Sequence, residues 1–248
     1  MYKVALIGCG NLGGIVARGL RDGKVPGCEL VAVLGRDKQR AESLAADCGC
    51  AACFDIESFL AFKPDFVLEA ATGEALKAYA VDCLNAGCSM VCLSVGALAD
   101  EGFYQNVEDA AAKNGVKLYV APGVIGGLDL AGSAMMAGEL QGVLTKYHYS
   151  SQKSQLPDVY DGSTREAIEM SPRHLNIAVA AGLACGSLDK TRIRLDIVPP
   201  EEEPGFTLEM QGEFGSAKIS CSRAGRGPAL AAYSALAVLK RITSNIVF

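Results

Sequence analysis

Val4-Ala5-Leu6-Ile7-Gly8-Cys9-Gly10-Asn11-Leu12-Gly13-Gly14 is the stretch that decides the fold of this chain. An apolar run ends in Gly-x-Gly-x-x-Gly, and the sequence then continues with helical spacing through Leu20. A strand, a tight glycine turn and a helix in this order are typical of dinucleotide-binding folds. Gly8 permits the turn, Gly10 lets the backbone approach a pyrophosphate, and Gly13 lets the helix pack closely on the strand. The first N–H groups of the helix then face the phosphate charge, which makes Asn11 and Leu12 candidate cofactor contacts.

Composition narrows the class of protein. The chain has 248 residues, of which half are hydrophobic, and it contains no Trp. This length is enough for one large domain or two small ones. The net charge of −5 and the absence of a basic run disfavour nucleic-acid and membrane-surface partners. No secretory pattern precedes the first strand, so we expect a cytoplasmic protein.

Ten cysteines raise the question of disulfides or metal. Cys83, Cys88, Cys92 and Cys185 lie inside apolar segments, where cysteine behaves as a small hydrophobic residue. Cys48, Cys50 and Cys53 form a CxCxxC cluster, but no second cluster and no histidine lie nearby in the sequence. A zinc site is therefore the less favoured interpretation, and we predict no metal site in a protein kept reduced.

The first half of the chain alternates between strand and helix patterns. Further apolar runs are separated by segments with helical spacing, which predicts a Rossmann-type parallel sheet with helices on both faces over residues 1–121. Ligands of such sheets bind beyond the carboxyl ends of the strands. The predicted strands after the first are Glu29–Leu34, Asp65–Ala70, Ser89–Ser94 and Val116–Ala121, and the predicted helices are Asp37–Asp47, Glu74–Ala86 and Asp100–Lys113.

After residue 121 the pattern changes. Strand-like runs follow one another without helical crossovers, which predicts an α+β domain with a mostly antiparallel sheet over residues 122–227. We expect Ser171 and Pro172 to begin a helix there, as N-cap and first helical residue. A last helix over residues 228–248 closes the fold, and its apolar character together with an open sheet face favours a homodimer. The predicted strands are Val143–Ser151, Thr191–Val198, Gly205–Gln211 and Ser216–Ser222, with further helices from Gly127 and Ser163.

The end of the second predicted strand bears on which dinucleotide binds. NAD-binding folds usually place an acid there to accept hydrogen bonds from the ribose 2′-OH. This chain has Gly35 followed by Arg36. A missing carboxylate leaves room for a 2′-phosphate, and a guanidinium pairs with phosphate in a bidentate manner, which favours NADP over NAD. The alternatives are that Arg36 stacks on the adenine, or that Asp37 takes the role of the acid.

Several longer motifs point to one family. Leu68-Glu69-Ala70-Ala71, Ser94-Val95-Gly96-Ala97-Leu98-Ala99-Asp100, Gly123-Val124-Ile125-Gly126-Gly127-Leu128-Asp129, the run Pro172 to Ala181 and Gly212-Glu213-Phe214-Gly215 resemble, in order, segments of the L-aspartate dehydrogenase family. This resemblance implies a homodimeric, two-domain enzyme that interconverts L-aspartate and iminosuccinate, or oxaloacetate plus ammonia, with NAD or NADP. It also implies cofactor contacts at Ser94, Gly96, Val124 and Asn176. Ala70 and Ala71 are further candidates because they lie at the carboxyl end of a predicted strand.

The resemblance breaks at the residue that performs the chemistry. The family has a histidine, taken as catalytic, a few residues before the Gly-x-Phe-Gly pattern, and this chain has Phe206 there. Phe206 neither donates nor accepts a proton. His174 and Lys153 are the candidate replacements, although a locally bonded histidine at a helix start and an exposed loop lysine are the simpler interpretations. We expect His148 to be a sheet residue.

These observations leave two candidate functions and disfavour a third. The first is an NAD(P)-dependent oxidoreductase of the aspartate dehydrogenase type, acting on aspartate or on another amino or imino acid. The second is a catalytically silent homologue that binds the cofactor as a sensor or interaction subunit. A sugar oxidoreductase is disfavoured, because Leu93-Ser94-Val95-Gly96 stands where such enzymes commonly have Glu-Lys-Pro.

Overall fold

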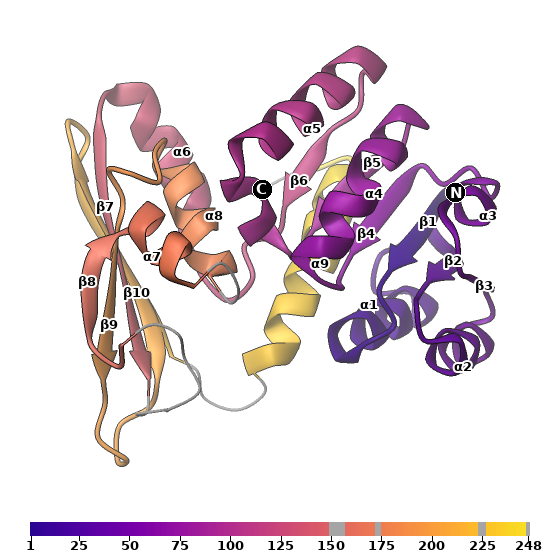
Figure 1. Cartoon of the computed structure of the whole chain (residues 1–248), viewed down its shortest axis with the longest axis horizontal. Helices are drawn as coiled ribbons and strands as arrows, with labels where there is room; N and C mark the ends of the chain where they lie inside the picture. Colours follow the sequence, from indigo (N-terminus) through magenta and orange to yellow (C-terminus); the bar gives the residue numbers. More distant parts are fainter. Residues whose placement is uncertain (149–156, 172–174, 223–226, 247–248) are drawn as a thin grey trace. The chain divides into compact units, whose positions relative to one another are not determined.

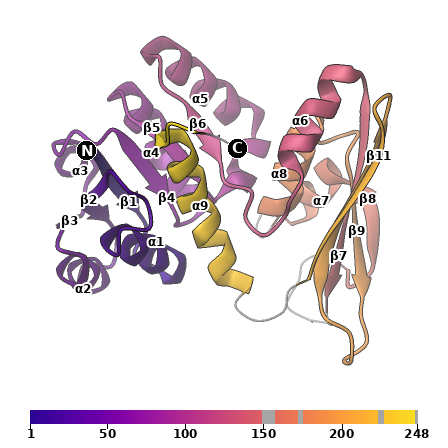
Figure 2. The same ribbon diagram turned by 180° about the vertical axis from the view of Figure 1, so that it is seen from behind.

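The computed structural model describes residues 1–148, 157–171, 175–222 and 227–246, and the chain divides into two compact units. The first unit comprises residues 1–123 and 228–248, and the second comprises residues 124–227. Figures 1 and 2 show both units from opposite sides, and each unit contains its own sheet. The C-terminal segment therefore belongs to the same unit as the N-terminus.

The first unit contains a six-stranded sheet in the order β3-β2-β1-β4-β5-β6. All five strand pairings are parallel, which confirms the predicted Rossmann-type sheet. The strand order reverses direction between β1 and β4, and ligands of open α/β sheets bind at such a switch point. The strands are β1 (Tyr2–Ile7), β2 (Cys28–Leu34), β3 (Ala51–Cys53), β4 (Phe66–Glu69), β5 (Ser89–Cys92) and β6 (Leu118–Val120).

Helices cover both faces of this sheet. One face is covered by α1 (Asn11–Arg21), α2 (Lys38–Cys48) and α9 (Gly227–Thr243), whose apolar residues share one buried cluster with the strands. The other face carries α4 (Gly73–Asn85) and α5 (Glu101–Asn114), which contact each other, and α3 (Ile56–Leu60), which contacts α4. Figure 1 shows α4 and α5 in front of the sheet, and Figure 2 shows α9 on the opposite side.

Side-chain caps explain where four of these helices begin. The side chain of the N-cap residue accepts a hydrogen bond from the backbone N–H three residues later, which satisfies an otherwise unpaired donor of the first turn. The capping residues are Asp37 for α2, Asp55 for α3, Thr72 for α4 and Asp100 for α5. By contrast, α1 begins at Gly10 without a side-chain cap.

The C-terminal helix α9 completes the core of the first unit. Ala232, Ala235, Leu236 and Leu239 are buried there, and a Cβ on Gly19 of α1 would lie only 2.4 Å from Cδ1 of Leu236. The buried apolar residues of α9 thus belong to the core of the first unit. The same helix also exposes Leu230 and Tyr233, and the expected homodimer stays a prediction.

The second unit contains a five-stranded sheet in the order β11-β10-β7-β9-β8. Only the pairing of β7 with β9 is parallel, so the sheet is mixed and mostly antiparallel, as predicted. Residues from α6, α7 and α8 share a buried cluster with the sheet. The elements are α6 (Leu128–Ala137), β7 (Leu140–His148), β8 (Tyr160–Ser163), α7 (Thr164–Met170), α8 (Asn176–Ala184), β9 (Arg192–Ile197), β10 (Gly205–Gly212) and β11 (Gly215–Ser222).

Three short elements, β3, α3 and β8, were not predicted. The strand β3 has three residues, too few for a periodic pattern. The strand β8 contains Asp161 and Gly162, two residue types that are poor strand formers. It pairs antiparallel with β9, and the Asp161 carboxylate accepts hydrogen bonds from both Arg192 (2.8 Å) and Arg194 (3.1 Å) of that strand.

The predicted start of a helix at Ser171 was wrong. Ser171 is the C-cap of α7, and its N–H donates to the carbonyl of Ala167 (2.9 Å). Helix α7 begins with a capping box in which the side chains of Ser163 and Glu166 each accept from the other's backbone N–H. The next helix, α8, begins at Asn176. In the part of the chain that the structure describes, we find no helix with the length and apolar character to cross a bilayer.

Candidate cofactor-binding site

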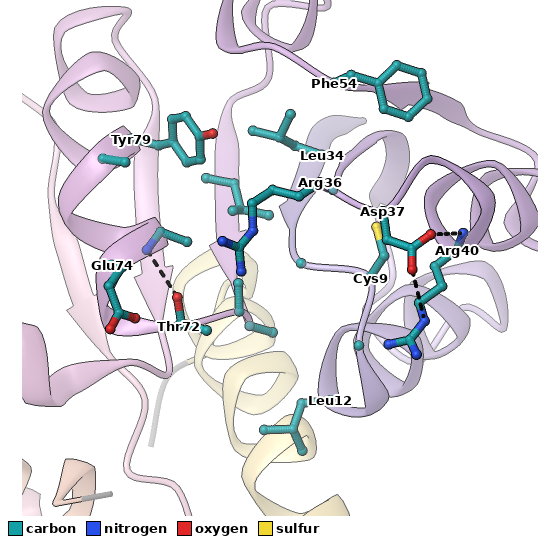
Figure 3. Close-up of a pocket in the computed structure, with 18 of the residues that line it drawn as sticks. Cys9, Leu12, Leu34, Arg36, Asp37, Arg40, Phe54, Thr72, Glu74 and Tyr79 are labelled. Carbon is teal, nitrogen blue, oxygen red and sulfur yellow. Dashed lines mark hydrogen bonds and ion pairs between the residues drawn. The ribbon is translucent and has the colours of Figure 1, made fainter. Parts of the chain in front are cut away.

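A cavity of about 980 Å³ lies at the carboxyl ends of β1, β2 and β4. It therefore occupies the switch point of the parallel sheet, where such folds bind ligands. Figure 3 shows the side chains that surround it. The lining residues come from the turn after β1 (Ile7 to Leu12), the end of β2 (Leu34 to Asp37, with Arg40), Phe54, the loop after β4 (Ala70 to Thr72) and the first turns of α4 (Glu74, Ala75, Ala78, Tyr79).

Two glycines of the first turn are required by the protein's own backbone. Gly8 has a φ of +114°, and a Cβ there would lie 2.6 Å from the carbonyl oxygen of Ala70. A Cβ on Gly13 would lie 1.9 Å from the carbonyl oxygen of Gly8. Both distances are far below van der Waals contact, so these glycines allow α1 to pack against the ends of β1 and β4.

Gly10 has a different role, because a Cβ there would meet no atom within 4 Å. The residue is the N-cap of α1, and the first turn of this helix contains no acidic side chain. The open space above Gly10 therefore adjoins unpaired N–H groups at the positive end of an 11-residue helix. This arrangement fits a pyrophosphate, whose oxygens accept hydrogen bonds from such N–H groups.

The segment that follows β2 contributes two arginines, Arg36 and Arg40, and one acid, Asp37, to the lining of the cavity. Arg36 lines the cavity and, in Figure 3, extends across it toward Thr72. The Asp37 carboxylate accepts from the backbone N–H of Arg40 (3.1 Å) and forms an ion pair with the Arg40 guanidinium (3.3 Å). Asp37 is thus engaged in capping α2, and the charged side chains that line the cavity with it are Arg36, Arg40 and Glu74.

A second, more polar hollow of about 560 Å³ adjoins the first. The two share Cys9, Gly10, Asn11 and Arg40. The additional lining comes from α1 and α2 and includes Arg18, Gln39, Ser43 and Asp47. Polar groups thus surround the side of the glycine turn that faces α2.

Glu69 is a buried acid that the sequence analysis did not single out as functional. It ends β4, its exposed fraction is 0%, and its carboxylate accepts hydrogen bonds from Ala71 and Ser94. Burial raises the pKa of Glu69, while the hydrogen bonds from Ser94 and Ala71 oppose that effect. The signal in the sequence was a glutamate at the end of an otherwise apolar strand, Phe66-Val67-Leu68-Glu69.

The chain matches two family models, one for each half. Residues 8–121 match the NAD binding domain of homoserine dehydrogenase, and residues 138–242 match the C-terminal domain of aspartate dehydrogenase. An L-aspartate dehydrogenase of Methanothermobacter thermautotrophicus is 32% identical, covering 99% of this chain and 98% of the relative. The chain belongs to the L-aspartate dehydrogenase family. It is therefore a member of a family of NAD(P)-binding oxidoreductases.

Other relatives agree with this assignment. An L-aspartate dehydrogenase of Archaeoglobus fulgidus is 32% identical, covering 98% of this chain and 97% of the relative. Among solved structures, aspartate dehydrogenase of Thermotoga maritima superposes with a TM-score of 0.81 at 22% identity, covering 100% of this chain and 99% of the other. At that identity the superposition supports the fold alone.

The cofactor contacts predicted from the sequence lie in three parts of the structure. Ser94 is buried beside Glu69, and Gly96 lies in the short helix η1 (Val95–Ala99) that follows β5. Val124 and Asn176 belong to the second unit, where Asn176 is the first residue of α8. The others line the cavity or support its glycine turn: Gly8, Gly10, Asn11, Leu12, Arg36, Ala70 and Ala71 line it, and Gly13 lies beneath Gly8.

The histidines, Lys153 and Phe206, which were considered for the family's acid–base step, belong to the second unit or lie outside the described residues. Phe206 lies in β10, where it pairs with Lys146 of β7 and Cys221 of β11, and it is only 7% exposed in an apolar cluster. His148 ends β7, as expected for a sheet residue, and its Nε2 lies 2.9 Å from the carbonyl oxygen of Asp158. His174 and Lys153 lie outside the residues that the structure describes.

Proposed function

We propose that this chain is an NAD(P)-dependent amino acid dehydrogenase that interconverts L-aspartate and iminosuccinate, or oxaloacetate plus ammonia. The observation that carries the proposal is the cavity at the sheet's switch point in a chain that matches L-aspartate dehydrogenases along its whole length. A bound nicotinamide cofactor supplies the hydride, and the protein supplies binding and orientation. The open space at Gly10 and the N-terminus of α1 fit the pyrophosphate of that cofactor.

The preferred cofactor in this proposal is NADP. Position 35 carries no carboxylate to accept from a ribose 2′-OH, and Asp37 is occupied by the first turn of α2 and by Arg40. Arg36 lines the cavity, and Arg40 lines both it and the adjoining polar hollow. The guanidinium groups of Arg36, just after β2, and of Arg40, in the first turn of α2, are suited to a 2′-phosphate, which offers the oxygen pairs that arginine binds in a bidentate manner.

The cofactor preference is tested with Arg36→Ala. We expect NADPH to bind at least about ten-fold more weakly while NADH binding changes little, because only NADPH has the 2′-phosphate. Lys38→Ala is the matched control, since Lys38 is a cation of the same turn that lies over the ring of Phe54 and does not line the cavity. Equal losses for both cofactors would instead favour stacking of Arg36 on the adenine.

With Phe206 at the position where the family has its histidine, the proton transfer needs a different acid–base group. We propose that the proton step is carried out by another group, with His174 and Lys153 as the first residues to substitute. Hydride transfer to a reactive imine needs less acid catalysis than amination of a carbonyl, so an imino acid other than iminosuccinate is also consistent with this proposal. Amino and oxo acids are therefore the substrate class.

The first assay follows oxidation of NADPH and of NADH with oxaloacetate plus ammonium, against a control without ammonium. Ammonium-dependent turnover supports the proposed reaction. Loss of this turnover in His174→Ala or Lys153→Ala, with cofactor binding retained, then assigns the acid–base group. Turnover without ammonium would point to reduction of the oxo acid itself and contradict the proposal.

Phe206 favours a second candidate function. A homologue that binds NAD(P) without catalysis, as a sensor or interaction subunit, keeps the cavity and needs no acid at position 206. Binding of NADPH measured by calorimetry, together with no turnover on any amino or oxo acid, distinguishes this function from the first.

We also propose a homodimer formed in the cytoplasm. The second-unit sheet has one face packed on α6, α7 and α8, and on the other face Asp161, Arg192 and Arg194 form a charged network. All ten cysteines are free thiols, in keeping with a reducing compartment. Light scattering coupled to size-exclusion chromatography tests the dimer, and a mass of 25.8 kDa would contradict it.

A further inference from the structure

The two loops that follow β4 and β5 are connected through the carboxylate of Glu69. Oε1 accepts from the backbone N–H of Ala71 (2.7 Å) and from the hydroxyl of Ser94 (2.7 Å). Oε2 accepts from the backbone N–H of Ser94 (3.0 Å). A single side chain thus receives donors from both loops at distances typical of strong hydrogen bonds.

Burial of this carboxylate lowers the stability of the folded state unless other groups compensate. Glu69 is completely buried, and burying a carboxylate removes its hydration. Among the residues that the structure describes, none is a cation paired with Glu69, so hydrogen bonds alone compensate for the lost water. A buried apolar residue would end β4 at lower cost. The acid therefore has a role beyond filling space.

One end of this connection lies at the candidate cofactor cavity, and the other begins the loop after the neighbouring strand β5. Ala71 lines the cavity and precedes Thr72, the N-cap of α4. Ser94 precedes η1, where its own N–H and hydroxyl are directed to Glu69 and the residue is 6% exposed. The hydroxyl of Ser94 consequently serves the loop rather than acting as a donor to a ligand.

We infer that Glu69 is a positioning residue: its carboxylate fixes the loops after β4 and β5 in the geometry that receives the nicotinamide half of the cofactor. This inference rests on the proposed function. The adenosine half is received at the ends of β1 and β2, by the glycine turn and Arg36, which do not contact Glu69 through any of these hydrogen bonds. The two halves of the ligand should therefore respond differently when Glu69 is changed.

Glu69→Gln is the diagnostic substitution. It keeps the size of the side chain but has one acceptor atom in place of two, because the amide nitrogen only donates. The backbone N–H groups of Ala71 and Ser94 are bound by different oxygens, so in either orientation of the amide one of them loses its acceptor. Ser94→Ala is a milder variant that removes only the hydroxyl donor. Glu108→Gln makes the same chemical change at an exposed position of α5 and is the matched control.

The first measurement needs no ligand. Amide hydrogen exchange of the whole chain should be faster in Glu69→Gln at residues 70–72 and 94–99, and unchanged at the glycine turn, compared with the wild type and Glu108→Gln. Faster exchange confined to these loops supports the positioning role. Unchanged loops, or faster exchange throughout the first unit, would overturn it. This result stands whether or not the chain binds a dinucleotide.

The second measurement compares NADPH with 2′-phospho-ADP-ribose, which lacks the nicotinamide. We expect Glu69→Gln to bind NADPH about ten-fold more weakly, Ser94→Ala to show a smaller loss, and both to bind the fragment as the wild type does. Equal losses for both ligands would overturn the role toward the nicotinamide half. A wild type that binds neither ligand would refute the proposed function. The role of Glu69 toward this cofactor would then be refuted as well. The exchange experiment would still show whether Glu69 fixes the two loops.

Discussion

The thiol of Cys9 fills the space into which a side chain at position 35 would extend. A Cβ on Gly35 would lie 2.8 Å from Sγ of Cys9 and 3.3 Å from Cβ of Ala41. Cys9, the residue between the first two glycines of the turn, therefore crowds a side chain at the end of β2, where an acid would stand. Burial, and to a lesser extent Asp37, raises the pKa of Cys9 to about 11, so this neighbour is a neutral thiol near pH 7.

This contact predicts how the cofactor preference can be reversed. Gly35→Asp alone should destabilise the protein by about 1–3 kcal/mol, because the new side chain overpacks against Cys9. Cys9→Ala combined with Gly35→Asp should recover most of that stability and bind NADH better than NADPH, since the new carboxylate accepts from the ribose 2′-OH and repels a 2′-phosphate. Thermal unfolding and cofactor titrations check both parts. Equal stability of the single and double variants would show that Cys9 is not the obstacle.

Substituting the other glycines of the turn should separate folding from binding. Gly13→Ala places a Cβ against the carbonyl of Gly8, so we expect it to cost about 1–3 kcal/mol of stability as well as cofactor affinity. Gly10→Ala meets no protein atom within 4 Å, so we expect the melting temperature of the wild type but a loss of at least about ten-fold in cofactor affinity. A Gly10→Ala variant that binds the cofactor normally would contradict placement of the pyrophosphate at Gly10.

The sequence was sufficient to predict five of the six strands of the first sheet because their signals are local. Apolar runs, the glycine turn and capping residues such as Asp37 and Asp100 each act within a few residues of one another. The strand β8 lacks such a signal, since Asp161 is held in place by Arg192 and Arg194 some thirty residues later. Ser171 carried a misleading signal: a Ser-Pro pair resembles a helix start, but Ser171 is the C-cap of α7, and the next helix begins at Asn176.

In the candidate site, too, some residues could be identified from the local sequence and others could not. Gly10 and Arg36 could be identified from spacing alone, and both line the cavity. The role of Glu69 could not, because its partners Ala71 and Ser94 come together only when β4 and β5 pair. For Ser94 the sequence predicted a cofactor contact, and the structure adds that its hydroxyl donates to Glu69.

Asp100 should stabilise the start of α5 through two interactions. Its carboxylate accepts from the N–H of Phe103 (3.1 Å) and pairs with Lys77 (2.6 Å). Asp100→Ala should cost about 1 kcal/mol near pH 7, as for other lost N-caps, whereas Asp100→Asn keeps a capping oxygen and should cost less. Lys77 and then the N–H of Phe103 lower the pKa of Asp100 below 3.8. The advantage of the wild type is therefore complete above pH 3.8 and is lost as the pH falls through the lowered pKa. Urea unfolding at pH 7 and pH 3 measures this difference, and an advantage that grows on acidification would contradict it.

Glu69 should give the opposite pH dependence. Burial raises its pKa above 4.5, so the folded chain holds this proton more tightly than the unfolded chain does. The stability of the wild type relative to Glu69→Gln should consequently be highest near pH 4.5 and decline as the pH rises toward the raised pKa, by at most about 1.4 kcal/mol per pH unit. The neighbouring thiol of Cys92 does not interfere, because burial and then the charge of Glu69 raise its pKa well above this range. Melting temperatures of the wild type, Glu69→Gln and Glu108→Gln between pH 4.5 and pH 8 provide the measurement. A wild type that gains stability over Glu69→Gln as the pH rises would mean that the hydrogen bonds from Ser94 and Ala71 outweigh burial.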